Sequence, residues 1–309
     1  MSDIPVSPLT LGTVQLGMPY GIANRCGMPD EETSFNILNA AVSLGITCLD
    51  TAAGYGQAET VIGSYFMNRA KPTIVTKLTP DIPSDLTDKE LERAVIGSVE
   101  QSLDRLRCGK VDIIMLHRPS HLLAYGGSML NACNRLVRDG YAGKIGISYG
   151  ADPVASFHEV WPWARNDLFE AVQIPLNALD NRLIRGGALT LLEESGKLVF
   201  ARSVFLQGLL QMSPEELPHT LRDAAGPLAG VRTLAEREGI TPGELALVYV
   251  RDIPQVHSLV IGAEHPRQVE ENIRMLRTPP LSEETRRKIH ALASGVPELV
   301  VSPHLWNRS

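Results

Sequence analysis

The feature that most constrains this chain is a repeated alternation of short apolar runs with longer amphipathic stretches. The apolar runs lie at residues 9–12, 46–50, 72–77, 111–116, 144–148, 171–175, 198–202 and 256–261. Apolar residues at helical spacing occupy residues 31–44, 58–68, 89–106, 127–138, 152–160, 187–195, 227–238, 242–251 and 266–276. This alternation predicts parallel strands joined by right-handed crossovers.

The number of strand–helix units predicts a closed barrel. Eight strand–helix units spread over about 270 residues fit an α/β fold of the (β/α)8 TIM-barrel type better than an open sheet. A doubly wound sheet normally carries G-x-G-x-x-G after an early strand, and none stands there. No long linker divides the 309 residues, so we expect one domain over residues 1–309 with extra C-terminal helices, including one at 282–293.

Charge and composition argue against several classes of protein. Lys and Arg number 29 against 35 Asp and Glu, a net charge of −6, which disfavours binding to nucleic acid or an anionic membrane. The cysteines at 26, 48, 108 and 133 form no C-x-x-C pair, so we expect free buried thiols and no metal site. No apolar run reaches the ~20 residues that span a bilayer, and no signal peptide is visible. We expect a soluble, cytoplasmic protein.

Ionisable side chains stand where consecutive predicted strands end. Asp50 ends one strand, and Tyr55 lies in the loop that follows, between two glycines. Lys77 ends the next strand, and His117 follows the one after that. Each of these residues alone is more often a cap, a rim residue or a packing residue. Strand ends converge at one mouth of a barrel and function concentrates there, so their coincidence favours a catalytic site.

These groups suit the reversible reduction of a carbonyl. A buried Lys77 beside Tyr55 favours the phenolate and makes Tyr55 a proton donor near neutral pH. Asp50 would pair with Lys77 and keep it charged and oriented, and His117 could hydrogen-bond the substrate oxygen. None of these residues can supply hydride, so a cofactor must do so.

Three motifs that contain these residues resemble those of a known family. LDTAAGYG, the Lys that ends PTIVTK, and DIIMLHRP resemble the aldo-keto reductase superfamily, over most of residues 11–272. The resemblance implies a catalytic tetrad of Asp50, Tyr55, Lys77 and His117, and a nicotinamide cofactor across the C-terminal mouth of the barrel. The opening LGTVQLGMPYGIAN is similar to a bacterial-type subgroup linked to sugar metabolism.

The resemblance also implies a cofactor site at the later strand ends. Ser148 and Gln173 would hold the nicotinamide carboxamide, because a hydroxyl and an amide both donate and accept. Tyr149 stands where many relatives carry Asn. The start of the helix at residue 266 suits a phosphate. The other implied contacts are Gly12, Thr13, Asp50, Ser203, Phe205, Leu206, Gln207, Gly208, Gly262, Ala263, Arg267, Gln268, Glu271 and Asn272.

The choice between NADP and NAD depends on the loop after the last strand. Many NADP-preferring relatives place Lys or Arg there, whereas this loop holds Glu264 and His265, with Arg267 as the nearest strong cation. Glu264 would repel a 2′-phosphate or bond a free ribose hydroxyl. Frequencies within the family favour NADP, and NAD stays possible.

The substrate pocket is expected in variable loops at 14–24, 118–128 and 297–309. Its candidate residues are Gln15, Met18, Tyr20, Arg118, Tyr125 and Trp306. Aromatic residues with a few polar groups suit a sugar or a small polar carbonyl better than a steroid, although each aromatic taken singly is equally consistent with scattered surface residues.

Three functions are compatible with these residues. The first is an NAD(P)-dependent carbonyl reductase or alcohol dehydrogenase acting on an aldehyde, ketone or keto sugar. The second is a redox-neutral epimerase or isomerase that retains its nicotinamide, because proton and hydride transfer are reversible. The third is a non-catalytic cofactor-binding subunit, similar to channel-associated members of the family. The expected partner is a small-molecule carbonyl or alcohol, and the protein a monomer or small homo-oligomer.

Overall fold

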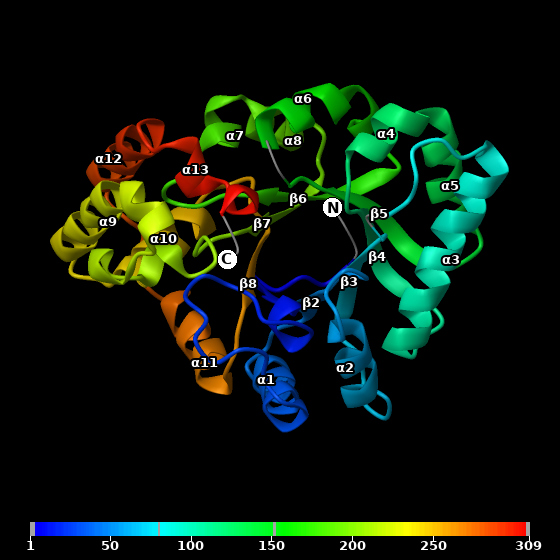
Figure 1. Cartoon of the computed structure of the whole chain (residues 1–309), viewed down its shortest axis with the longest axis horizontal. Coiled ribbons are helices and arrows are strands. Elements are labelled where there is room, and N and C mark those ends of the chain that lie inside the picture. Colours follow the sequence, from blue (N-terminus) through cyan, green and yellow to red (C-terminus); the bar gives the residue numbers. More distant parts are fainter. Residues whose placement is uncertain (1–3, 80, 151–152, 307–309) are drawn as a thin grey trace.

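A closed barrel of eight parallel strands forms the centre of the computed structural model, which describes residues 4–79, 81–150 and 153–306 (Figure 1). The strands pair in chain order, and the last closes on the first. They are β1 (Leu9–Gly12), β2 (Cys48–Asp50), β3 (Thr73–Lys77), β4 (Val111–Leu116), β5 (Ala142–Ser148), β6 (Phe169–Pro175), β7 (Leu198–Arg202) and β8 (Ser258–Gly262). The predicted (β/α)8 barrel is confirmed.

Helices surround the barrel in Figure 1. They are α1 (Glu31–Ser43), α2 (Ala58–Tyr65), α3 (Asp88–Leu106), α4 (Ser120–Tyr125), α5 (Gly127–Arg138), α6 (Pro153–Ala164), α7 (Arg182–Arg185), α8 (Ala188–Glu194), α9 (Ala225–Glu238), α10 (Pro242–Arg251), α11 (Pro266–Met275), α12 (Glu283–Ser294) and α13 (Glu298–Val301). Short 3₁₀ turns lie at residues 14–16, 209–211, 214–216, 219–224 and 303–305. α12 corresponds to the added C-terminal helix predicted at 282–293, whereas α13 is a short helix within residues 297–309, which were expected to form a loop.

The helices begin at capping residues that the sequence displays. The Asp30 side chain accepts a hydrogen bond from the backbone N–H of residue 33 at the start of α1. Thr87 with Glu90, and Thr241 with Glu244, form capping boxes at α3 and α10. Such caps satisfy N–H groups that have no partner within the helix. The start predicted for the helix at 152–160 lies outside the described residues.

Some element bounds differ from the prediction. β2 begins at Cys48 and not at 46, because the N–H of Ile46 bonds the carbonyl of Ala41 at the end of α1 (3.0 Å). β8 is shifted to Ser258–Gly262, because its pairing with β1 runs from Leu9 up to Gly12. α4 and α7 were not predicted, since helices of 6 and 4 residues are too short to show a helical period.

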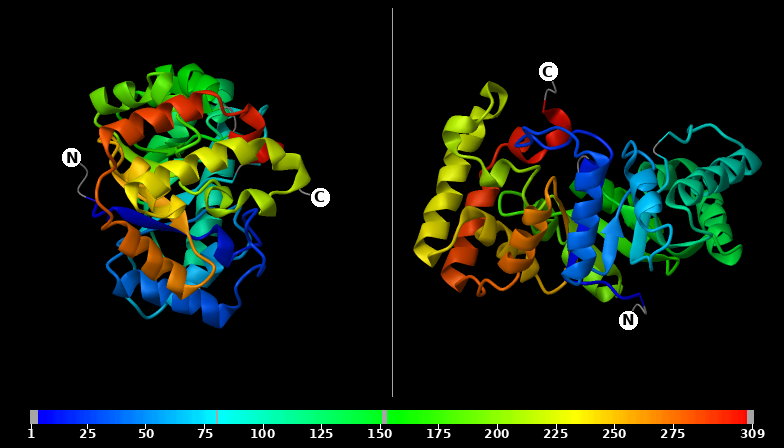
Figure 2. Two further views of the ribbon diagram at one scale, coloured as in Figure 1. Left: turned by 90° about the vertical axis from the view of Figure 1, so that its left-hand side faces the viewer. Right: turned by 90° about the horizontal axis from the view of Figure 1, so that it is seen from below.

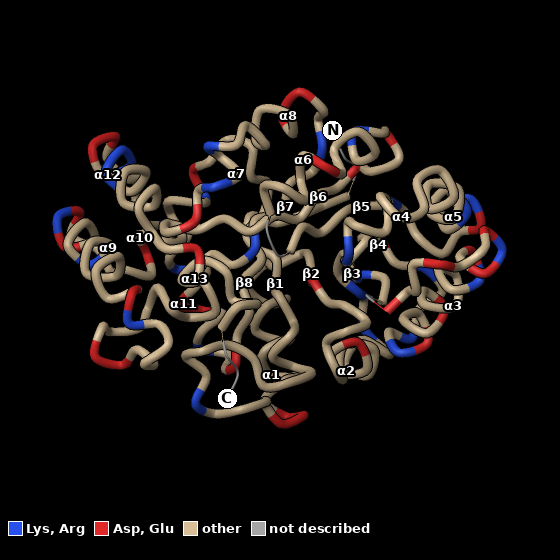
Figure 3. The backbone as a smooth tube through the Cα atoms, turned by 45° about the horizontal axis from the view of Figure 1, so that its top comes forward, with Lys and Arg blue, Asp and Glu red and all other residues tan. Residues whose placement is uncertain are grey.

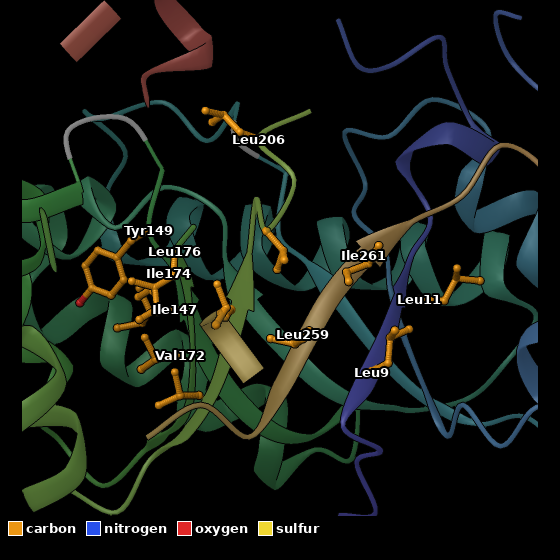
Figure 4. Close-up of a cluster of buried hydrophobic side chains, with 14 of the residues drawn as sticks. Leu9, Leu11, Ile147, Tyr149, Val172, Ile174, Leu176, Leu206, Leu259 and Ile261 are labelled. Atoms are coloured by element: carbon orange, nitrogen blue, oxygen red, sulfur yellow. The ribbon is translucent and has the colours of Figure 1, made fainter. Parts of the chain in front are cut away.

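The core has two layers separated by the barrel wall. An inner cluster fills the barrel with Cys48, Val75, Ile113, Met115, Ala171, Leu198 and Phe200. The residues that alternate with these in the strands point outward and pack under the helices, and Figure 4 shows part of that outer cluster, with Val172, Ile174 and Leu259. This period of two is the geometry of barrel strands. It also decides which residues face the mouth of the barrel.

The surface carries most of the charge. Figure 3 shows that Lys, Arg, Asp and Glu gather on outer helices such as α3, α5, α9 and α12. Among the described residues no helix is long and apolar enough to cross a membrane, and no group of three or more His, Cys, Asp or Glu could hold a metal ion. The four cysteines are free; two are buried, but Cys26 is exposed, contrary to the expectation of buried thiols.

Candidate active site

The candidate site is built from strand residues that continue the inner face of the barrel to its C-terminal mouth. Alternate residues of a strand face the same side, so a residue two positions beyond an inner-core residue also points inward. Asp50, Lys77 and His117 stand in this relation to Cys48, Val75 and Met115. The sequence-predicted tetrad residues on β2, β3 and β4 are therefore brought together by strand geometry.

A buried ion pair lies at the base of the site. The Lys77 Nζ donates to both carboxylate oxygens of Asp50, at 2.7 and 2.8 Å, and to the carbonyl of Thr51 at 2.9 Å. The two side chains are 0% and 4% exposed. Burial by itself lowers the pKa of Lys77, but the charge of Asp50, with smaller contributions from Tyr55, raises it above its usual range. Lys77 is therefore a fixed positive charge.

Three further side chains hold Asp50 in place, one of them through another. The Gln173 amide donates to Asp50 Oδ1 at 2.7 Å, and the Ser148 hydroxyl donates to Gln173 Oε1 at 3.0 Å. The N–H and the hydroxyl of Thr13 both bond the carbonyl of Asp50, each at 2.9 Å. One amide proton of Gln173 and the lone pairs of Ser148 stay open to a ligand.

Tyr55 and His117 lie above the ion pair. The Lys77 Nζ is 5.0 Å from the centre of the Tyr55 ring, and the rings of Tyr55 and His117 are 6.1 Å apart, edge to face. Burial, then the charges of Lys77, Arg202 and Arg118, lower the pKa of His117 to about 3. The imidazole is therefore neutral near pH 7. Its Nδ1 is buried and makes no hydrogen bond within the described part of the chain.

Two glycines let the Tyr55 loop close over the barrel. A Cβ on Gly17, in the loop after β1, would lie 1.8 Å from the carbonyl oxygen of Tyr55. A Cβ on Gly56 would lie 2.2 Å from the carbonyl oxygen of Gly17, and Gly56 has a φ of +54°. No other residue fits such a backbone-to-backbone contact. The loop after β1 therefore fixes the height of Tyr55 above Lys77.

A cavity of about 920 Å³ opens over these residues. Figure 2 shows the loop after β1 and α13 at this end of the barrel. The predicted residues on its surface are Gly12, Thr13, Gln15, Tyr20, Asp50, Tyr55, His117, Arg118, Ser148, Gln173, Ser203, Phe205, Leu206, Gln207, Gly208, Gly262, Ala263, Gln268, Glu271 and Asn272. Lys77 lies beneath this surface, behind Asp50. The volume is at the upper end for small-ligand sites.

A family model described as "Aldo/keto reductase family" matches residues 8–294. The chain belongs to the aldo/keto reductase family. The family is one of oxidoreductases that use nicotinamide cofactors.

Relatives match this aldo/keto reductase over most of its length. An uncharacterized oxidoreductase of Bacillus subtilis, YqkF, is 25% identical over 98% of this chain and 97% of its own. A Schizosaccharomyces pombe protein named after the beta subunit of voltage-gated potassium channels is 26% identical over 87% of this chain and 86% of its own. The holo form of aldo-keto reductase AKR11C1 from Bacillus halodurans has the same fold, with a TM-score of 0.75 and 24% identity, over 98% of this chain and 97% of that one.

The loop after β7 in this aldo/keto reductase has the backbone shape of an anion site. Leu206, Gln207 and Gly208 have φ values of +49°, +56° and +90°, and Ser203 has +63°. Left-handed non-glycine residues are strained and concentrate at functional sites. The N–H groups of Phe205 and Gln207 make no hydrogen bond within residues 4–79, 81–150 and 153–306. Such open N–H groups fit a pyrophosphate.

The part of the cavity lined by the loop after β8 and by α11 is acidic. Glu264 and Glu271 line it, and burial raises the pKa of Glu264. Gln268 accepts a hydrogen bond from the N–H of Glu264 at 2.6 Å. The Arg267 side chain is 78% exposed, pairs with Glu271 at 3.0 Å, and does not line the cavity.

Three predicted pocket residues also lie off the cavity surface. Trp306 is buried, and its indole N–H bonds the backbone of α13 at 2.7 Å. The Tyr125 hydroxyl bonds the backbone of the loop between β3 and α3. Met18 is half-buried beside the Tyr55 loop. We leave these residues out of the proposed pocket, because Trp306 and Tyr125 use their polar groups to hold loops together.

Tyr149 also turns away from the cavity. Its side chain is fully buried, packs on Phe157 with ring centres 5.1 Å apart, and in Figure 4 lies near Ile147 and Ile174. It therefore cannot replace the Asn that many relatives use toward the carboxamide. Its backbone carbonyl has another use, since it accepts a hydrogen bond from Arg202 at 2.7 Å.

Arg202 is the site residue that sequence reasoning missed. It ends β7 two positions beyond Phe200, so it points into the barrel mouth, and it lines the cavity. The sequence did contain a signal for Arg202, because it is an ionisable residue at the end of a predicted strand, as Asp50 and Lys77 are. Asn177 and Asp180, from the loop after β6, and Arg182, the first residue of α7, also line the cavity and were not predicted.

Proposed function

We propose that this protein is an NAD(P)H-dependent carbonyl reductase that works reversibly as an alcohol dehydrogenase, with Tyr55 as the general acid. The observation that carries the proposal is the buried Asp50–Lys77 pair directly beneath the Tyr55 ring, with a neutral His117 beside it. All of this lies at one end of a cavity of about 920 Å³, which suits a dinucleotide and a small carbonyl.

Each side chain has a separate role in the proposed reaction. Tyr55 gives its hydroxyl proton to the carbonyl oxygen, and the charge of Lys77 stabilises the phenolate that remains. Neutral His117 holds the carbonyl oxygen by a hydrogen bond, which orients the substrate without changing the net charge. Asp50 keeps Lys77 in position. A reduced nicotinamide, when bound, supplies the hydride that none of these residues can.

The residues present fit such a cofactor. Ser148 and Gln173 keep hydrogen-bonding capacity for a carboxamide, and the N–H groups of the loop after β7 would hold a pyrophosphate. Gly12 and Gly262 pair across β1 and β8, and both line the cavity.

The acidic end of the cavity supports NAD more than NADP, although frequencies within the family favour NADP. A 2′-phosphate there would face Glu264 and Glu271, and the nearest cation, Arg267, already pairs with Glu271 in solvent. A free ribose 2′-hydroxyl can instead donate to a carboxylate. We expect NADH to bind more tightly than NADPH in a fluorescence titration; the reverse order would contradict this part of the proposal.

A turnover assay tests the proposed reaction. The protein is mixed with NADH or NADPH and a panel of aldehydes, keto sugars and diketones, and the near-ultraviolet absorbance of the reduced nicotinamide is followed. Tyr55→Phe should abolish turnover and keep cofactor binding, whereas Tyr141→Phe, a surface tyrosine bonded to Glu100, should change neither. Full activity of Tyr55→Phe would refute the acid role.

A second function has one observation in its favour. The relative named after a channel beta subunit suggests a cofactor-binding subunit of a larger assembly. That function predicts nucleotide binding without turnover and a stoichiometric partner in a pull-down from the native cell. Four further predictions from the sequence stay predictions: a redox-neutral isomerase activity, a role in sugar metabolism, a cytoplasmic location, and a monomeric or small homo-oligomeric state.

A further inference from the structure

Two arginines stand at the reacting end of the cavity. Arg118 directly follows His117, and Arg202 ends β7 on the inner face of the barrel. Both line the cavity, and the charges of both contribute to the lowered pKa of His117. The structure therefore places two positive charges on the cavity surface in the neighbourhood of His117.

Neither positive charge is neutralised by the protein. Of the acids on the cavity surface, Asp50 pairs with Lys77, and Asp180 holds Arg182 at 2.8 Å. Glu264 and Glu271 belong to the loop after β8 and to α11, at the adenosine end. Within the described residues neither Arg118 nor Arg202 forms an ion pair with a carboxylate. The reacting end therefore carries an excess of positive charge.

Arg202 is also held in one orientation. Its Nη2 donates to the carbonyl of Tyr149 at 2.7 Å, and its Nη1 donates to the Ser203 hydroxyl at 2.9 Å. A guanidinium has five N–H donors, so these two bonds fix the plane of the group and leave donors for a ligand. A planar, fixed guanidinium is suited to an anion with two oxygens, such as a carboxylate.

We propose that this reductase selects carbonyl substrates that carry a carboxylate, which Arg202 binds and Arg118 attracts. The proposal rests on the proposed function and adds the class of substrate. Arg202 is the binding residue because it is oriented and half-buried, whereas Arg118 is exposed and acts through solvent. The phosphates of the cofactor are the other source of anionic oxygen near β7, so the experiment must separate the two.

The test compares a matched pair of aldehydes. para-Carboxybenzaldehyde and para-formylbenzamide have the same shape and differ in charge. A hydrogen bond to a charged group contributes about 1.5–3 kcal/mol, so kcat/KM should favour the carboxylate by about 10- to 100-fold. The preference should fall with rising salt, as screening requires.

Two variants locate the effect. Arg202→Gln should bring the carboxylate-to-amide ratio close to one, and Arg118→Gln should lower it less. Arg138→Gln, whose side chain is 74% exposed on α5, is the control and should keep the ratio. A ratio near one in the unaltered protein, or an unchanged ratio in Arg202→Gln, would overturn the proposal. The proposal would also be overturned if Arg202→Gln bound NADH and NADPH about tenfold more weakly but kept the carboxylate-to-amide ratio, because Arg202 would then bind the cofactor.

A binding measurement keeps the two proposals separate. Calorimetric titration with para-carboxybenzyl alcohol and para-carbamoylbenzyl alcohol gives the charge preference without turnover. Preference for the carboxylate without any turnover supports the anion site and contradicts the proposed reaction. Turnover of both aldehydes without any charge preference contradicts the anion site alone.

Discussion

The ion pair under Tyr55 allows the stability of the barrel to be separated from its chemistry. Lys77→Met would remove three hydrogen bonds of 2.7 to 2.9 Å and leave the Asp50 carboxylate, which is 4% exposed, without a counter-charge. Leaving one partner of a buried pair uncompensated costs about 3–5 kcal/mol. Replacing both charges is far less costly, because no unpaired charge stays in the barrel. We therefore expect Asp50→Asn/Lys77→Met to recover most of the lost stability.

Urea unfolding of the unaltered protein, both single variants and the double variant measures the coupling directly. Lys288→Met, in a solvent-exposed pair on α12, is the control and should leave the unfolding midpoint nearly unchanged. Both Lys77→Met and the double variant should lack reductase activity, since Tyr55 loses its cation in each. A loss below about 1 kcal/mol in the single variant, or a double variant as unstable as Lys77→Met, would refute this account of the pair.

Further predictions follow from the same geometry. Because the pKa of His117 is about 3 in the folded protein, below its ordinary 6.5, the folded state loses stability as pH falls below about 6.5, by up to ~1.4 kcal/mol per pH unit. Urea unfolding between pH 7 and 5 should therefore show a smaller loss of stability in His117→Gln than in the unaltered protein. An equal loss in the two proteins would contradict the lowered pKa. Gly17→Ala should displace the Tyr55 loop and abolish turnover while circular dichroism shows an intact barrel; Gly97→Ala, with no neighbour within 4 Å of its Cβ, should keep full activity. Glu264→Gln should tighten NADPH binding relative to NADH in fluorescence titrations, and an unchanged ratio would remove that carboxylate from the 2′ site.

The sequence predicted the barrel because its signals are local and repeated. Each strand is a short apolar run, and caps such as Thr87 with Glu90 mark helix starts. The strand ends then indicate Asp50, Lys77 and His117, since parallel strands of a barrel end at one mouth. Element bounds were less accurate where tertiary hydrogen bonds decide, as at Ile46, whose N–H is taken by the end of α1.

The variable loops could not be predicted in the same way. The sequence shows only that Trp306 and Tyr125 are aromatic residues in segments expected to form loops near the mouth. Their polar groups bond the backbone of α13 and of the loop after β3, and such pairings join segments far apart in the chain. Arg267 likewise looked like a phosphate ligand, but its position on α11 directs it toward Glu271 and solvent.

The inner face of the barrel accounts for both the proposed chemistry and the missed arginine. The inward positions at the mouth are Gly12, Asp50, Lys77, His117, Ser148, Gln173, Arg202 and Gly262. The glycines of β1 and β8 line the cavity. The carboxylate, ammonium and imidazole groups carried by β2 to β4 lie near Tyr55. The Gln173 amide of β6, held by the Ser148 hydroxyl of β5, bonds Asp50. At β7 this face carries a positive charge without a carboxylate partner. A mouth with a proton donor near β2 to β4 and an unneutralised cation at the end of β7 is suited to a carbonyl substrate that brings its own negative charge.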